Sequence, residues 1–185
     1  MNLFTLLLIV TYTTIVVSLI WARFRFFNIQ SSSSRFGSRL YDPVVTINFA
    51  LTYFFFITET KSVLVSKLAC LIFYLVGLGV FWWSIFTAKE LDFAFSHRTG
   101  IIVTSGPYAW VRHPIYLSYI FIWLGSTILF NSILLWVTLV YLVTFYITSA
   151  LTEEKVLLSG GYTREYQTYS QKVGMFLPRI TLWKR

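Results

Sequence analysis

Two short stretches hold the side chains best suited to chemistry. The first, residues 97–113, ends in Arg112-His113, and the second, residues 153–165, begins with Glu153-Glu154. An imidazole or a carboxylate can accept a proton, and a carboxylate can also bind a cation. Free backbone N–H groups at a helix start can hold an anion. If the chain brings the two stretches together, we expect a site where the helix start holds an anion and Glu153 binds a cation or a sugar hydroxyl.

Tyrosines near the first stretch add flat surfaces to this pocket. Tyr108 and Tyr116 could each lie against an aromatic ring or a cation. Simpler interpretations stay open for the same residues. Arg112 and His113 could contact lipid headgroups while the tyrosines form an interfacial belt. The acidic pair could cap the helix that follows it.

The elements that must position these residues are apolar. Of the 185 residues, 57% are hydrophobic and only 12% are charged, against about 25% charged in an ordinary soluble domain. Charge-free runs that could cross a bilayer cover 3–21, 44–58, 68–88 and 114–152. The last run is long enough for two crossings, so we expect a helical hairpin that turns at Asn131-Ser132. The fold class is an all-α integral membrane protein with about five transmembrane helices.

One of these spans has an alternative. The run 44–58 follows a polar loop that we expect to end at Asp42-Pro43, and its 15 residues are few for a full crossing. A re-entrant or tilted segment is therefore possible there. We expect a single membrane domain over 1–185, with three spans in 1–89. No cleavage site follows the first apolar run, so we expect it to remain as a span.

The basic residues predict the orientation. With five spans, all of the 15 Lys and Arg residues except Lys61 and Lys67 fall on one side of the membrane. The positive-inside rule then places the N-terminus outside and the C-terminus in the cytoplasm. The net charge of +8 is thus an orientation signal, and no nucleic-acid partner is expected. We expect a multi-pass protein, in a bacterial inner membrane or the endoplasmic reticulum, with a pocket that faces the cytoplasm.

Several function classes lose support. The apolar runs contain no ionisable Asp, Glu, Lys, Arg or His, which argues against an ion-coupled transporter. Two histidines 16 residues apart and the lone Cys70 make no recognisable metal site, so no metal is expected. No dinucleotide fingerprint or nucleophile elbow is present.

The C-terminal half resembles a known family. The residues from Val103 to Tyr116 contain Arg-His-Pro-Ile-Tyr, and an apolar hairpin, the Glu153-Glu154 pair, Glu165-Tyr166 and Leu177-Pro178 follow. This succession resembles the isoprenylcysteine carboxyl methyltransferase family, whose members are integral membrane enzymes that use S-adenosylmethionine. Phospholipid N-methyltransferases share related motifs. The resemblance implies that 90–185 is the catalytic half, built on the hairpin 114–152.

By position, the resemblance also implies the site. The residues matched to contacts with S-adenosylmethionine are Gly100, Ile101, Ile102, Val103, Tyr108, His113, Pro114, Ile115, Tyr116 and Glu153. The implied reaction is methyl transfer to a hydrophobic or membrane-dissolved acceptor, which would enter laterally from the bilayer. Glu153 and His113 are the two candidate bases for an amine or hydroxyl acceptor, whereas a carboxylate or thiolate acceptor needs none.

Two departures from the family pattern concern the acceptor and the segment over the site. Ser149 stands where the prenylcysteine enzymes have an arginine tied to the acceptor, which argues against a prenylcysteine carboxylate. The spacing near Gly160-Gly161 is one residue longer than usual. Alternatives therefore stay open: a phospholipid amine N-methyltransferase, a sterol-type membrane reductase, or a lipid-binding membrane protein without enzymatic activity.

Overall fold

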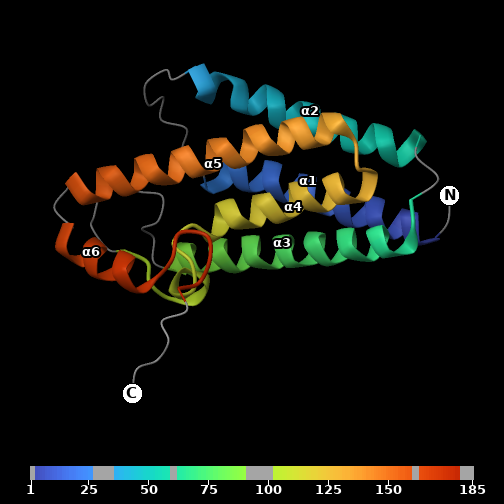
Figure 1. The fold of residues 1–185 in the computed structure, drawn as a ribbon. Helices are drawn as coiled ribbons and strands as arrows, with labels where there is room; N and C mark the ends of the chain where they lie inside the picture. The colour runs from blue at the N-terminus through green and yellow to red at the C-terminus, as the bar shows by residue number, and fades with distance from the viewer. Residues whose placement is uncertain (1–2, 27–35, 59–61, 91–101, 160–162, 180–185) are drawn as a thin grey trace. The chain divides into compact units, whose positions relative to one another are not determined.

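The computed structural model describes residues 3–26, 36–58, 62–90, 102–159 and 163–179, and regular structure in these ranges is helical. The elements are α1 (Leu3–Phe26), α2 (Phe36–Thr58), α3 (Leu64–Glu90), the 3-10 turn η1 (Gly106–Ala109), α4 (Pro114–Phe130), α5 (Ile133–Ser159) and α6 (Thr163–Lys172) (Figure 1). Among them α1, α2, α3 and α5 are long and apolar enough to cross a membrane. The chain is an all-α, multi-pass integral membrane protein.

The expected hairpin is confirmed, and its turn lies where the sequence placed it. Helix α4 begins at Pro114, whose missing N–H costs nothing in a first turn. Asn131 follows the helix with a φ of 46°, in the left-handed region that asparagine tolerates well. Its side-chain oxygen accepts a hydrogen bond from the Trp136 indole at 3.0 Å. At 17 residues, α4 reaches about 25 Å, the lower limit for a crossing.

Helix α2 begins earlier than the sequence suggested. The expected loop up to Asp42-Pro43 is wrong, because the helix starts at Phe36 and contains Pro43 at the loss of one backbone hydrogen bond. The Arg23 guanidinium donates two hydrogen bonds to the Asp42 carboxylate, at 2.6 and 2.7 Å. The span lengthens to the 19 residues Leu40–Thr58, which favours a full crossing over a re-entrant segment.

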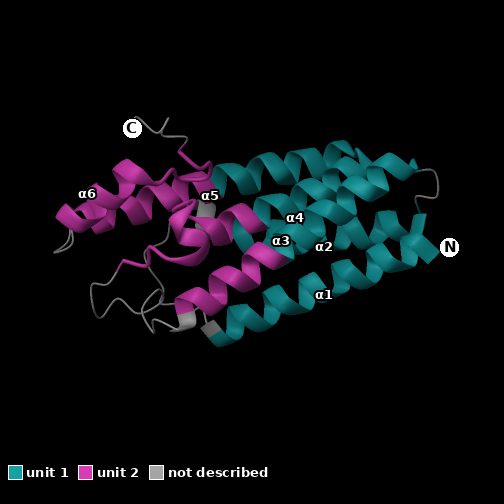
Figure 2. Ribbon diagram, turned by 90° about the horizontal axis from the view of Figure 1, so that it is seen from below, with its two compact units in different colours: residues 1–78, 119–145 teal, residues 79–118, 146–185 magenta. Residues whose placement is uncertain are grey.

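The described part of the chain divides into two compact units, which Figure 2 shows in teal and magenta. Unit 1 comprises residues 1–78 and 119–145. Its core contains Tyr12, which stacks on Tyr74 at 5.4 Å, and the Tyr74 hydroxyl lies 2.7 Å from that of Ser126. Polar hydrogen bonds between apolar helices thus help to fix this unit.

Unit 2 comprises residues 79–118 and 146–185. It contains the last turns of α3, the η1 turn, the first turn of α4, the last part of α5, and α6. Every predicted site residue that the structure describes lies in this unit. The single membrane domain that we expect over 1–185 stays a prediction.

Candidate active site

A buried ion pair anchors the site. Arg112 Nε lies 2.9 Å from Glu154 Oε1, and Arg112 Nη2 lies 3.0 Å from Glu154 Oε2, so the pair is bidentate. The two side chains are only 9% and 13% exposed. Burial opposes the charge on Arg112, but the hydrogen bonds and charge of Glu154 outweigh it and hold the arginine pKa above its usual value.

The same arginine fixes the C-terminal part of unit 2. Its Nη1 atom donates hydrogen bonds to the Ser170 and Val173 carbonyl oxygens, at 3.1 and 2.5 Å. The backbone N–H of Arg112 donates to the Gly174 carbonyl at 2.8 Å, beside a parallel bridge between Val111 and Gly174. Arg112 therefore connects the segment before α4 to α5 and to the end of α6.

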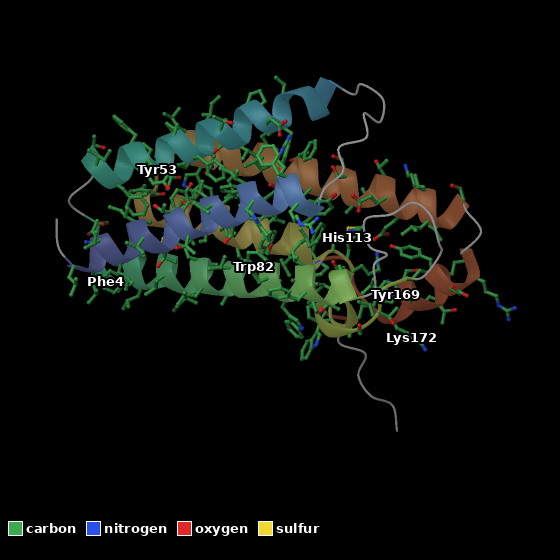
Figure 3. All side chains as sticks on the ribbon, turned by 180° about the vertical axis from the view of Figure 1, so that it is seen from behind. Phe4, Tyr53, Trp82, His113, Tyr169 and Lys172 are labelled. Atoms are coloured by element: carbon green, nitrogen blue, oxygen red, sulfur yellow. The ribbon has the colours of Figure 1, made fainter. Side chains whose placement is uncertain are left out.

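His113 lies between the two acidic residues. Its Nε2 is 3.0 Å from Glu154 Oε1, and its Nδ1 is 3.6 Å from Glu153 Oε2. The imidazole is 10% exposed and is labelled in Figure 3. Because the Arg112 pair holds Glu154 in place, the contact at Nε2 orients the ring and directs Nδ1 toward Glu153.

Glu153 is the acidic group that remains accessible. Its side chain is 51% exposed, and its Oε1 accepts a hydrogen bond from the Tyr116 hydroxyl. The rings beside it are stacked: Tyr116 lies 5.4 Å from Tyr146 and 5.8 Å from His113. A carboxylate held at the edge of stacked rings is a suitable place for an organic cation.

The η1 turn carries Tyr108, another residue that the sequence predicted at the site. Gly106 has a φ of 56°, and a Cβ there would lie 2.6 Å from Thr87 Oγ1, so the backbone needs glycine at this point. The Tyr169 hydroxyl of α6 donates a hydrogen bond to the Tyr108 carbonyl oxygen at 2.7 Å. Burial raises the pKa of Tyr169 to about 12 and raises the pKa of Tyr108 further. The nearby Glu153 charge adds to the effect on Tyr108.

The structure brings part of the predicted set together. It brings His113, Tyr116 and Glu153 into contact and places Tyr108 near the Glu153 charge. Pro114 and Ile115 begin α4, between His113 and Tyr116 in the chain. Ile102 and Val103 lie before η1, and Val103 is buried. Gly100 and Ile101 lie outside the described residues.

Two simpler interpretations are wrong for the residues that the structure buries or places inside a helix, whereas the interfacial belt of tyrosines stays a prediction. Arg112 does not extend to headgroups, because its guanidinium is buried against Glu154. The acidic pair does not cap a following helix, because both residues lie within α5, which continues to Ser159. The Arg112–Glu154 pairing was not predicted from the sequence, although Arg112 adjoins His113 and Glu154 adjoins Glu153.

The geometry can hold a cationic small molecule at Glu153 and keep a base beside it. Among the residues that the structure describes, no three His, Cys, Asp or Glu side chains are grouped so as to hold a metal ion.

Comparisons with known proteins agree with the resemblance. The model of the isoprenylcysteine carboxyl methyltransferase family matches residues 62–159. The protein-S-isoprenylcysteine O-methyltransferase of Saccharomyces cerevisiae is 29% identical over 94 residues, which are 51% of this chain and 36% of the yeast protein. The chain thus matches about a third of that relative's length. No solved structure matches the chain. Since the family match covers more than half of its residues and includes Arg112-His113 and Glu153-Glu154, the chain belongs to the isoprenylcysteine carboxyl methyltransferase family.

Proposed function

We propose that this protein is a membrane methyltransferase that uses S-adenosylmethionine and acts on a hydrophobic acceptor. The observation that carries the proposal is the half-exposed Glu153 carboxylate, held by Tyr116 and His113 beside stacked rings. It lies within the part of the chain that matches the family.

The residues of this site fit the cofactor. S-adenosylmethionine carries a sulfonium and an amino group as cations, and an adenine ring; when bound, it supplies an electrophilic methyl group. Glu153 would attract a cation, and the ring of Tyr116, which stacks on the buried Tyr146, would provide a flat surface. The protein's contribution to the reaction is mainly to align the acceptor with the methyl group.

Two groups can take a proton from an amine or hydroxyl acceptor. Glu153 Oε2 and His113 Nδ1 lie 3.6 Å apart, and Nδ1 is the ring nitrogen that Glu154 leaves available. A carboxylate or thiolate acceptor would be ionised already and would need neither group.

The residue at position 149 of α5 bears on which acceptor the protein methylates. Ser149 precedes Glu153 by four residues on α5, so the two lie on the same face of that helix. The yeast relative is named for a prenylcysteine acceptor, and a prenylated compound is therefore the first acceptor to test. A neutral serine at this position favours a second candidate, a phospholipid amine, whose reacting group needs no cationic partner.

The experiment is a calorimetric titration of the purified protein with S-adenosylmethionine. We expect saturable binding that Glu153→Gln abolishes and Tyr116→Phe weakens roughly ten- to a hundredfold, the range for a hydrogen bond to a charged group. Tyr53→Phe is the matched control, because it removes a hydroxyl that donates to Thr13 in unit 1. Absence of binding, or equal weakening in the control, would refute the site.

The acceptor is tested separately. Membranes containing the protein are incubated with methyl-labelled S-adenosylmethionine, and lipids are separated from prenylated compounds. Label that depends on Glu153 and appears in a prenylated compound supports the first acceptor; label in phosphatidylethanolamine supports the second. Label in neither fraction contradicts both acceptor assignments.

A further inference from the structure

Unit 2 contains a cavity, lined by both apolar and charged side chains, that the proposed methyl-transfer chemistry does not use. Its volume is about 610 Å³, and its walls include Thr104 and Ala109 on the η1 side. Helix α6 forms the other wall with Arg164, Thr168 and Lys172, among others. We refer to it as the α6 groove.

The helical spacing of the basic side chains suits one small anion. Arg164, Thr168 and Lys172 follow one another at intervals of four and therefore lie along one face of α6. The two cations are about 12 Å apart along the axis, and both are long enough to reach an anion near the Thr168 hydroxyl between them. Among the described residues, neither cation forms an ion pair.

The charge of the groove indicates which anion it prefers. Glu165 also lines the cavity, so the three ionised groups sum to a single positive charge. One negative charge balances it, as in a phosphodiester, whereas the second negative charge of a free phosphate dianion would be left without a balancing cation in the groove. A phosphodiester is the anionic group of a phospholipid.

The position of α6 relative to the membrane indicates that a phospholipid supplies the phosphodiester. Helix α5 has 27 residues and is about 40 Å long, which exceeds the ~30 Å hydrocarbon core and reaches the headgroup layer. Helix α6 begins at Thr163, four residues after α5 ends at Ser159, within about 14 Å even for extended chain. The α6 groove therefore lies where lipid phosphates are concentrated.

We propose that the α6 groove binds the phosphodiester of a membrane phospholipid headgroup through Arg164 and Lys172. This site holds the protein's C-terminal segment against the membrane surface. It does not depend on the proposed methyltransferase activity, so either can fail alone.

The test measures binding of dihexanoyl phosphatidylglycerol to the full chain in neutral detergent. We expect saturable binding that Arg164→Gln/Lys172→Gln weakens at least tenfold. Lys155→Gln is the control, because it removes an exposed positive charge that does not line the groove. Equal weakening in the control would show nonspecific attraction and overturn the proposal.

Two further probes and one further measurement separate the alternatives. Dihexanoylglycerol, which lacks the phosphate, should not bind; equal binding would assign the affinity to acyl chains and overturn the proposal. Inorganic phosphate should compete poorly, and competition at equal concentration would mark a site for free anions instead. The double variant should keep the thermal midpoint and S-adenosylmethionine affinity of the unaltered chain. Loss of that affinity would assign the groove to the cofactor site and contradict the lipid site.

Discussion

At the residue scale, His113 shows how a neighbouring contact can decide a side chain's role. Its Nε2 is 3.0 Å from Glu154, which is itself held by two hydrogen bonds from Arg112. The imidazole is therefore oriented by residues that need not touch a cofactor, and Nδ1 is left to face Glu153. Two adjacent carboxylates on α5 thus have different environments: Glu154 is buried and paired, while Glu153 is accessible.

The buried pair leads to a stability prediction. We expect Glu154→Gln to lower the free energy of unfolding by about 3–5 kcal/mol, because it leaves the Arg112 charge buried without its partner. Reversible unfolding in mixed micelles would measure the change. Glu165→Gln makes the same chemical change on an exposed side chain of α6, and should alter stability by less than about 0.5 kcal/mol. A loss for Glu154→Gln no larger than the control's would contradict a stabilising pair.

At the element scale, the η1 turn depends on one glycine. Gly106 combines a φ of 56° with a close approach to Thr87, so a side chain there is unfavourable on both counts. We expect Gly106→Ala to cost about 1–3 kcal/mol in unfolding free energy. Gly79→Ala is the control, because a Cβ at Gly79 would meet nothing within 4 Å. Differential scanning fluorimetry should show a lower midpoint only for the first variant, and equal midpoints would refute the requirement for glycine.

The elements also show what could be predicted from the sequence. The hairpin turn was predictable, because a charge-free run of 39 residues must fold back and Asn131 suits the turn. The start of α2 was not, because Asp42-Pro43 has the local signature of a loop, whereas the helix there includes a side-chain pairing with Arg23. Local patterns contain no information about such a partner.

The same limit applies to the site. His113, Tyr116 and Glu153 could be selected because their types and the family pattern agree with each other. The pairing of Arg112 with Glu154 joins residues 42 positions apart, and nothing in either stretch says that the arginine prefers a carboxylate to headgroups. The α6 groove likewise depends on where a short polar helix packs.

At the scale of the whole molecule, the number of crossings depends on α4. This helix has 17 residues and is shorter than the four helices that qualify as spans by length. However, Tyr116 in its first turn bonds to Glu153 near the far end of α5. The chain leaves this site along α4 and returns to it along α5. If α5 crosses the bilayer, α4 must cross it as well, which makes five crossings.

Five crossings predict that the segment after α1 and the C-terminal segment share the cytoplasmic side, whereas four would separate them. The buried Cys70 is replaced by serine, and single cysteines are introduced as Ser32→Cys, Ser62→Cys and Gln171→Cys. In intact cells, a membrane-impermeant maleimide should label only the cysteine at position 62. The segment between α2 and α3 is expected outside, because only Lys61 and Lys67 fall on that side of the membrane. Permeabilised cells should label all three, which controls for reactivity. Labelling at position 32 without labelling at 171, or the reverse, would contradict five crossings and leave α4 as a helix that does not span.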